Sequence, residues 1–259
     1  MGAEAARRSK RGRLSGTAPL VLGGTLTLSF AAAALAGPPY ISDDPEPTDY
    51  RHYEIYLFAA GSEGPGNSGK EAGIDFNYGG APDLQLTAVV PVTYQRPSDA
   101  TTGGGVGNVE LAAKYRFLHQ SGAGWDVAFF PRLFLPNGSE PGEQHFALLL
   151  PFWVEKDWGK WSTFGGGGCE INKGGGGSRN FCLAGWVLAR QLLPDLQLGI
   201  EIAHQGADTD NGHPATEIGL GLHYDVAQHF HVLAYAAPTI ENASENGRYS
   251  WYAALLLTF

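Results

Sequence analysis

The sequence predicts an all-β fold: an antiparallel, up-and-down transmembrane β-barrel of 12 strands, with both chain ends at the same mouth. Three observations lead to this prediction. The last twelve residues alternate strictly between two faces, segments with strand periodicity recur along the chain, and the links between these segments alternate between short and long.

The C-terminal stretch 248–259 carries the clearest pattern. Every second position is apolar, and side chains with a period of two leave opposite faces of a strand. Its length suits a tilted membrane-crossing strand, and aromatics at both ends predict two interfacial girdles. A terminal Phe is also how outer-membrane barrels of Gram-negative bacteria commonly end. Taken alone, the segment could also be an edge strand of a soluble sandwich. The apolar positions are Tyr249, Trp251, Ala253, Leu255, Leu257 and Phe259.

The N-terminal stretch predicts export. Five basic residues between Arg7 and Arg13 precede an apolar run from Ala18 to Ala36, which ends in a small-x-small cleavage site. We therefore expect a signal peptide over residues 1–36 and the general secretory route, with an uncleaved anchor as the alternative. Both termini of the barrel would then lie on the periplasmic side of the outer membrane.

Composition argues against a nucleic-acid partner. Without residues 1–36, twelve Lys and Arg stand against 25 Asp and Glu, a formal charge of −13. After the leader there is no apolar run of about 18 residues, so no transmembrane helix is predicted, and barrel strands remain compatible with this.

Residues 37–51 are rich in Pro, Asp and Glu and cannot form a membrane strand. We expect them in the periplasm or tucked into the mouth of the barrel, as a segment separate from the barrel domain 52–259.

The same region carries a family resemblance. Pro38-Pro39-Tyr40, Asp43-Asp44-Pro45-Glu46-Pro47 and His52-Tyr53-Glu54 resemble the start of the outer-membrane barrel transporters grouped under the meta-pathway of phenol degradation. The stretches 81–86 and 107–117 continue the match. The resemblance implies a transporter of small, including aromatic, molecules, and it implies no catalytic residues.

From His52 onward, twelve segments show strand periodicity. The seventh is the weakest because Gly165 to Gly168 flatten its pattern. The segments are 52–60, 70–78, 83–95, 106–118, 124–135, 144–155, 160–168, 180–190, 195–205, 215–224, 228–238 and 247–259.

Short and long links alternate between these segments along the chain. Short ones lie at 79–82, 119–123, 156–159, 191–194 and 225–227. Longer ones lie at 61–69, 96–105, 136–143, 169–179, 206–214 and 239–246. Short periplasmic turns and longer outer loops are typical of outer-membrane barrels. An even strand count also lets the last strand pair with the first.

If the apolar set faces lipid, the other set faces the lumen. Charges there must line a wet channel or form ion pairs that fill the interior, and both readings stay open. The carboxylates in this phase are Glu54, Glu71, Asp75, Glu110, Asp126, Glu155, Glu201 and Glu217. The bases are Lys114, Arg116, Arg132, Arg190 and Arg248.

Aromatic side chains share the inward phase. They could form a slot for small apolar or aromatic solutes, or pack against residues 37–51 as a plug. They are Tyr56, Phe58, Phe130, Phe134, Tyr235 and Tyr252.

His223, His229 and His231 flank one short turn and share the inward phase. Such a trio could bind a divalent metal or change charge between about pH 5 and 8. Imidazoles that simply sit at a wet rim are the alternative, and we assign neither a metal nor any other cofactor.

Cys169 and Cys182 predict a disulfide that closes a loop, because the protein is expected to be exported. The glycine runs Gly165 to Gly168 and Gly174 to Gly177 are interpreted as flexible loop with tight turns. Phosphate binding would need a strand, a Gly-rich turn and a helix, and that pattern is missing.

The predicted function is a channel or transporter for passive passage of small solutes. The partners expected are outer-membrane lipid, the barrel-assembly machinery through the last strand, and a small solute of unknown identity. A closed-lumen structural or binding barrel is one alternative. A membrane-embedded lipid-modifying enzyme is another, with Ser250 and His231 on neighbouring strands as a candidate pair, but we expect no enzyme.

Overall fold

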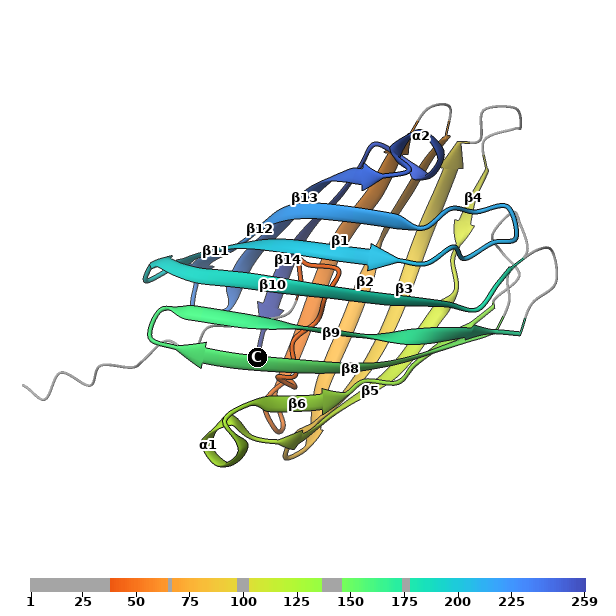
Figure 1. Cartoon of the computed structure of the whole chain (residues 1–259). Coiled ribbons are helices and arrows are strands. Elements are labelled where there is room, and N and C mark those ends of the chain that lie inside the picture. Colours follow the sequence, from red (N-terminus) through yellow and green to blue (C-terminus); the bar gives the residue numbers. More distant parts are fainter. Residues whose placement is uncertain (1–37, 65–66, 97–102, 137–145, 174–177) are drawn as a thin grey trace, which may run out of the picture. The chain divides into compact units, whose positions relative to one another are not determined.

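The computed structural model describes residues 38–64, 67–96, 103–136, 146–173 and 178–259 (Figure 1). The predictions for the leader, residues 1–36, and for Gly174 to Gly177 fall outside this part of the chain. Among the described residues, two helices are four residues long, α1 (Gln120–Ala123) and α2 (Ala243–Asn246). None of the helices in these residues is long and apolar enough to cross a membrane.

Strands dominate the fold. In chain order they are β1 (Tyr53–Gly64), β2 (Asn67–Ala81), β3 (Leu84–Arg96), β4 (Gly103–Val106), β5 (Val109–Leu118), β6 (Asp126–Phe129), β7 (Arg132–Leu135), β8 (Ala147–Trp158), β9 (Trp161–Asn172), β10 (Phe181–Leu193), β11 (Leu196–Gln205), β12 (Ala215–Ala227), β13 (Phe230–Glu241) and β14 (Tyr249–Thr258).

The sheet closes on itself. Each strand pairs antiparallel with its neighbours, and β1 pairs with both β2 and β14, so the two ends of the chain join the ring. β3 pairs with both β4 and β5, and β8 pairs with both β6 and β7. β4 and β5 together occupy one strand position in the wall, and β6 and β7 together occupy another. The structure therefore confirms the predicted closed barrel of 12 strands.

A proline accounts for one of the two interruptions. Phe130 and Pro131 separate β6 from β7, and Pro131 has no N–H to donate to a ladder. The backbone still bridges to its neighbours, since Phe130 N–H donates to the carbonyl of Pro151 at 3.1 Å and Pro131 accepts from Ala113 N–H at 3.2 Å. Phe130 is thereby turned inward and is buried.

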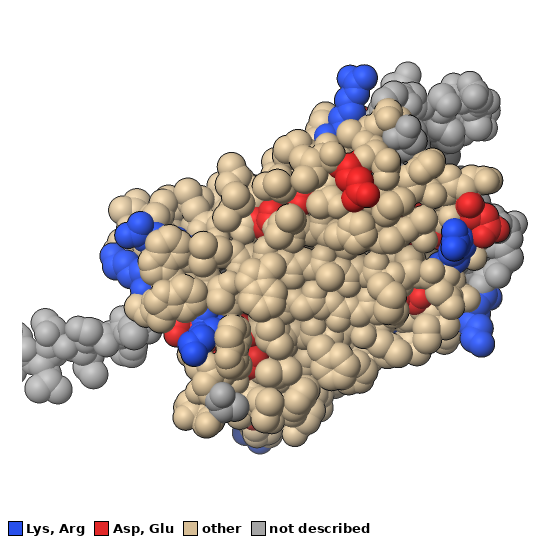
Figure 2. Space-filling view, in the orientation of Figure 1, with Lys and Arg blue, Asp and Glu red and all other residues tan. Residues whose placement is uncertain are grey.

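The two faces of the wall differ as the alternation predicts. In β14, Leu255 is 37% exposed and Leu256 only 4%. In β8, Phe152 is half-exposed while Trp153 is buried. Figure 2 shows a broad uncharged band along the wall over β8 to β11, with charged side chains toward its two ends. An exposed apolar band of this kind is what a hydrocarbon layer covers.

The barrel has two distinct ends, which we call the turn end and the loop end. At the turn end the connections are residues 82–83, 119–125, 159–160, 194–195 and 228–229. The loop end holds residues 206–214 and 242–248, among others. One expected loop is wrong. β1 and β2 remain paired up to Gly64 and Asn67, so most of the stretch 61–69 is strand.

Residues 38–51, here called the lumenal segment, run inside the barrel (orange in Figure 1). Hydrogen bonds join them to strands far away in sequence, including β3, β5 and β11. Of the two locations expected for this stretch, the structure places it inside the barrel.

Candidate functional site

The lumen contains a cavity of about 510 Å³. Its walls come from the lumenal segment and from the inner faces of β1, β2, β3, β5 and β14. Arg132 and Phe134 of β7, His223 of β12 and Leu233 of β13 also contribute. A second cavity, of about 460 Å³, contains Ser62, Lys70 and Ser250 from the loop-end half of the barrel.

The two cavities follow one another along β1 and share part of their lining. Glu54, Tyr56 and Phe58 of β1 border the first cavity, and Ala60, Gly61 and Ser62 border the second. The residues that border both are Pro39, Tyr40 and Ile41 of the lumenal segment and Glu71, Thr93 and Tyr252 of the wall. A solute that crosses the barrel along β1 would therefore pass residues 39–41.

The predicted inward carboxylates divide into groups. Glu54, Glu71, Asp75 and Glu110 line the first cavity, and Glu71 and Glu217 line the second. Glu155 and Glu201 are buried, and Asp126 lies at the turn end, where it accepts the N–H of Gln120 at 2.9 Å. The candidate carboxylates thus extend over the whole length of the barrel interior.

Arg132 makes the tightest charged contact of the cavity wall. Its Nε and one terminal nitrogen donate to the two carboxylate oxygens of Glu110, at 2.7 and 2.8 Å. Such bidentate pairing holds the guanidinium in one orientation. In that orientation Arg132 also lies 5.7 Å from the ring centroids of both Phe130 and Phe134.

The predicted aromatic slot is only partly assembled. Tyr56, Phe58, Phe130, Phe134 and Tyr252 line the first cavity, and the rings of Phe58 and Tyr252 stack with their centroids 6.1 Å apart. Tyr235 instead contacts Tyr40 of the lumenal segment, at 5.8 Å between centroids, and borders the second cavity. One of the six aromatic residues, Tyr235, therefore packs against the lumenal segment and does not line the slot.

Two bases predicted in the lumen do not lie there. Arg190 is exposed and stacks on the ring of Trp161 at 4.9 Å, because its strand turns Val187 and Ala189 inward. Both faces of this strand are apolar, so apolarity did not mark the lipid side. Arg248 precedes β14 and is exposed, with its backbone N–H bonded to Glu63 at the loop end.

Arg116 lies at the turn end instead of the cavity. It contacts Asp83 at 3.1 Å and, more distantly, Glu46 at 3.9 Å and Asp126 at 4.0 Å. It therefore joins the lumenal segment to the β2–β3 turn.

The lumenal segment is held by buried polar groups. Glu201 is 1% exposed and accepts the backbone N–H groups of Ile41 and Ser42 at 3.0 and 2.6 Å. Lys114 donates to Asp43 at 3.0 Å and lies 3.6 Å from Asp44. Charges this far from solvent are stable only when paired, so the segment and the barrel satisfy each other.

Two carboxyl groups of the lumenal segment have raised pKa values and therefore stay protonated to higher pH than exposed carboxyls. Burial raises the pKa of Asp44 to about 8, although the ammonium of Lys114 acts in the opposite direction. Burial also raises the pKa of Glu46, against the effect of Arg116. Asp43, at 3.0 Å from Lys114, is the segment carboxylate best placed for the ion pair.

A third anchor of the segment escaped the sequence analysis. Gln85 accepts the backbone N–H of Thr48 at 2.8 Å and donates to Asn77 at 2.7 Å. Tyr40 was also missed as a site residue. It packs between Phe164 and Tyr235, over the positions of Gly199 and Gly221, where a Cβ atom would collide with its ring. Inward-facing glycines in two adjacent strands were the available signal.

Only two of the three predicted histidines come together. Asp225 Oδ1 lies 3.1 Å from His223 Nε2 and 2.6 Å from His231 Nδ1. His229 is exposed and stacks on Phe259, with the ring centroids 6.3 Å apart. Asp225, and not His229, is the third member of the cluster with His223 and His231.

The candidate catalytic pair is not formed. Ser250 is opposite Ala237 and His231 is opposite Leu256, so six residues, or roughly 20 Å, separate them along the hairpin. Ser250 donates to Glu217, and His231 contacts Asp225 and Thr258.

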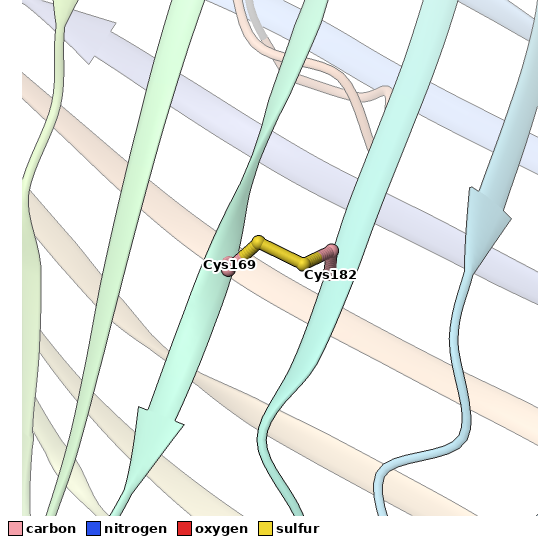
Figure 3. Close-up of a disulfide and its surroundings, with 2 residues drawn as sticks. All are labelled: Cys169 and Cys182. Atoms are coloured by element: carbon pink, nitrogen blue, oxygen red, sulfur yellow. A yellow bond between two sulfur atoms is a disulfide. The ribbon is translucent and has the colours of Figure 1, made fainter.

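The disulfide between Cys169 and Cys182 is present (Figure 3). The two residues are direct partners in the β9–β10 ladder, so the bridge closes the connection between these strands as expected, and the first part of the expected loop 169–179 is strand because β9 continues to Asn172. Gly165 to Gly168 are likewise strand and not loop. A Cβ atom on Gly165, Gly167 or Gly168 would collide with the backbone of an adjacent strand, so these glycines allow close strand approach.

The family described as "Putative MetA-pathway of phenol degradation" matches residues 69–255. The chain belongs to this family. The match takes in most of the barrel and begins after the lumenal segment. No curated protein matches the sequence significantly.

Two solved structures share the architecture. The COG4313 outer-membrane channel from Pseudomonas putida F1 aligns with a TM-score of 0.60 at 15% identity, covering 83% of this chain and 99% of that one. The KdgM porin, solved with disordered oligogalacturonate, aligns with a TM-score of 0.52 at 9% identity, covering 80% and 99%. At these identities the likeness concerns the fold. The protein is thus a barrel of the bacterial outer membrane.

Proposed function

We propose that this barrel is a passive channel for small solutes, and that the lumenal segment restricts the passage. The observation that carries the proposal is the pair of cavities that follow one another along β1, with residues 39–41 bordering both. A barrel filled only for stability would have little use for two cavities next to one short segment.

The orientation proposed for the barrel follows from its two ends. The turn end, with both the C-terminal Phe259 and the start of β1, would face the periplasm. The loop end would face outward. The closing strand β14, with its terminal Phe259, would be the element that the barrel-assembly machinery engages, and a signal peptide over residues 1–36 would direct export.

The lining predicts the kind of solute. Seven carboxylates and two basic side chains border the first cavity. Two of the carboxylates, Asp43 and Glu110, are directly paired with those bases. Asp44, with a pKa of about 8, is mostly protonated at neutral pH, and the carboxylates that stay ionised would favour cations over anions of equal size. The adjoining rings of Phe58, Phe130, Phe134 and Tyr252 would accept the flat face of an aromatic solute.

Planar-bilayer recording of the purified protein tests the proposal. We expect small, cation-preferring steps from the intact chain and several-fold larger steps from a variant that lacks residues 38–47. That variant would be refolded from inclusion bodies, so that export plays no part in the result.

Each other outcome has a meaning. Steps from the deletion variant alone would show that the intact lumen is closed by its segment. Silence from both would reject the channel and favour a structural or binding barrel. Phospholipid hydrolysis by the intact protein, lost on Ser250→Ala, would favour an enzyme.

A further inference from the structure

A cluster of side chains of the types that bind metals lies at the turn end of the lumen, apart from the lumenal segment and the residues that hold it. His223 and Asp225 come from β12 and His231 from β13, and one ligand atom from each lies within 4.8 Å of the other two. The three residues fall within nine positions of one hairpin. A single structural unit therefore provides all of the ligands.

Strand geometry explains why they meet. His223 and Asp225 are two residues apart and so share the inner face of β12. Asp225 is opposite His231 in the ladder, and a register shift follows between Asp225 and Ala227. The two imidazole rings stand nearly perpendicular, at 70°, with centroids 5.5 Å apart. Their nitrogens converge on one oxygen, Asp225 Oδ1.

Thr258 supports the cluster from β14. His231 Nε2 lies 3.3 Å from Thr258 Oγ1. With Nε2–H donating to this hydroxyl, loss of the proton that Nδ1 shares with Asp225 would leave the Nδ1 lone pair for the ion. Metal-bound imidazoles commonly use their second nitrogen in this way, and the outer hydrogen bond fixes the tautomer that binds the ion.

Two of the three distances between ligand atoms can be compared with the spacing that a small cation needs. Ligands at about 2.1 Å from a tetrahedral ion stand roughly 3.4 Å from one another. The contact of 3.1 Å between His223 and Asp225 nearly meets this spacing. The contact of 2.6 Å between His231 and Asp225 is a hydrogen bond, and its proton is what the ion would displace. The Asp225 side chain is 37% exposed and free to adjust.

We propose that His223, Asp225 and His231 bind one divalent transition-metal ion, with zinc or nickel as the expected occupants. Two imidazoles and one carboxylate suit these ions, whereas magnesium and calcium prefer sites made entirely of oxygen. The fourth position is left to water or a solute group. Since His223 and Thr258 border the first cavity, the ion would enter through the lumen.

The position suggests what the ion does. It would place two positive charges at the turn end of a cavity that otherwise carries mostly carboxylates. The current of cations through the barrel would then fall on metal binding, without any movement of the lumenal segment.

Calorimetric titration of the untagged protein in detergent, after chelator treatment, tests the site. Zinc chloride and nickel chloride are the probes. We expect one ion bound per chain, and at least tenfold weaker binding in His223→Ala and in Asp225→Asn. His229→Ala is the matched control, because this histidine lies in the same turn but stacks on Phe259 and should bind metal no differently from the parent.

The results are decisive either way. Absence of saturable binding to the intact protein would overturn the proposal. Equal loss in His229→Ala and His223→Ala would overturn it as well, since the binding would then be nonspecific. Heat-modified mobility on SDS gels identifies any variant that has not folded, and Asp225→Asn alone then decides. Because binding is measured directly, a failure of the channel proposal would leave this test unaffected.

Discussion

The inner face of the wall differs between β1–β5 and β9–β12. The first region is polar: Gln85 bonds to Asn77 and Thr87, and Glu110 is paired with Arg132. The second region is packed: Phe164, Val187 and Ala189 are fully buried against one another, with Tyr40 packed on the cluster. The cavity wall comes mostly from the polar region.

This difference shows how one barrel can hold a plug and still leave a path. On the packed side, small residues such as Gly199 and Gly221 leave room for the ring of Tyr40. On the polar side, ion pairs and amides hold the segment without filling the space next to it. We infer that the segment is fixed by ion pairs and amides on the polar side, and on the packed side by the fit of Tyr40 together with the carboxylate of Glu201.

Replacing Lys114 by Met should have the largest effect. Asp43 would lose its partner, and removal of one member of a buried ion pair costs about 3–5 kcal/mol. The fraction of channels with a released segment should rise by roughly 100-fold or more, measured as open time in planar bilayers. Lys70→Met is the matched control, because Lys70 pairs with Glu63 on the exposed rim. Equal open times for K114M and K70M would contradict the inference that the Lys114–Asp43 ion pair holds the lumenal segment.

Replacing Tyr40 by Ala should act on the packed side with a smaller effect. Two edge-to-face ring contacts, to Phe164 and Tyr235, would be lost. Aromatic pairs contribute about 0.5–1.5 kcal/mol each, or about 1–3 kcal/mol for the two, so open time should rise by roughly fivefold to 150-fold. Tyr40→Phe keeps both contacts and should behave like the parent protein. If Y40F opened as often as Y40A, shape would not be what holds the segment.

The smallest effect should come from a change of one pH unit. Docked Asp44 has a pKa of about 8, above that of an exposed carboxyl, so the docked state binds the extra proton. Between about pH 4 and that value, raising the pH removes this stabilisation and favours release. Lys114, Glu155, Asp43 and Glu46 face the group.

Open time should therefore increase with pH across this window, by up to tenfold per pH unit for one titrating group. Asp44→Asn cannot titrate and should give a flatter profile. A profile that is steeper in D44N, or an opening that increases toward acid, would reverse the assigned direction.

Much of the fold could be predicted from the sequence because a strand's phase is a local property. Leu84, Leu86 and Val90 identified the outer face of β3 from their spacing alone. The method failed where the inner face is apolar too. Val187 and Ala189 turn inward to pack on Phe164, so the phase of β10 was misread and Arg190 was placed in the lumen.

The candidate site could be predicted only in part. Inward phase identified Glu110, Lys114 and Arg132, but not which partner each would meet. His229 shares the phase of His231, yet its ring stacks on Phe259. The sequence analysis ended the strand at residue 224 and placed Asp225 in a turn, whereas β12 continues to Ala227. Asp225 was therefore not considered as a metal ligand.

The sequence by itself indicated the strand segments and the oil-facing side of most strands, since these depend on neighbours two residues apart. The even number of segments indicated that the first and last strands could pair and close the ring. Only the tertiary structure decided where residues 38–51 lie, because Glu201 meets Ile41 and Ser42 across some 160 positions of the chain. Contacts across a lumen depend on the register and tilt of every strand between the partners, and no local pattern contains that information.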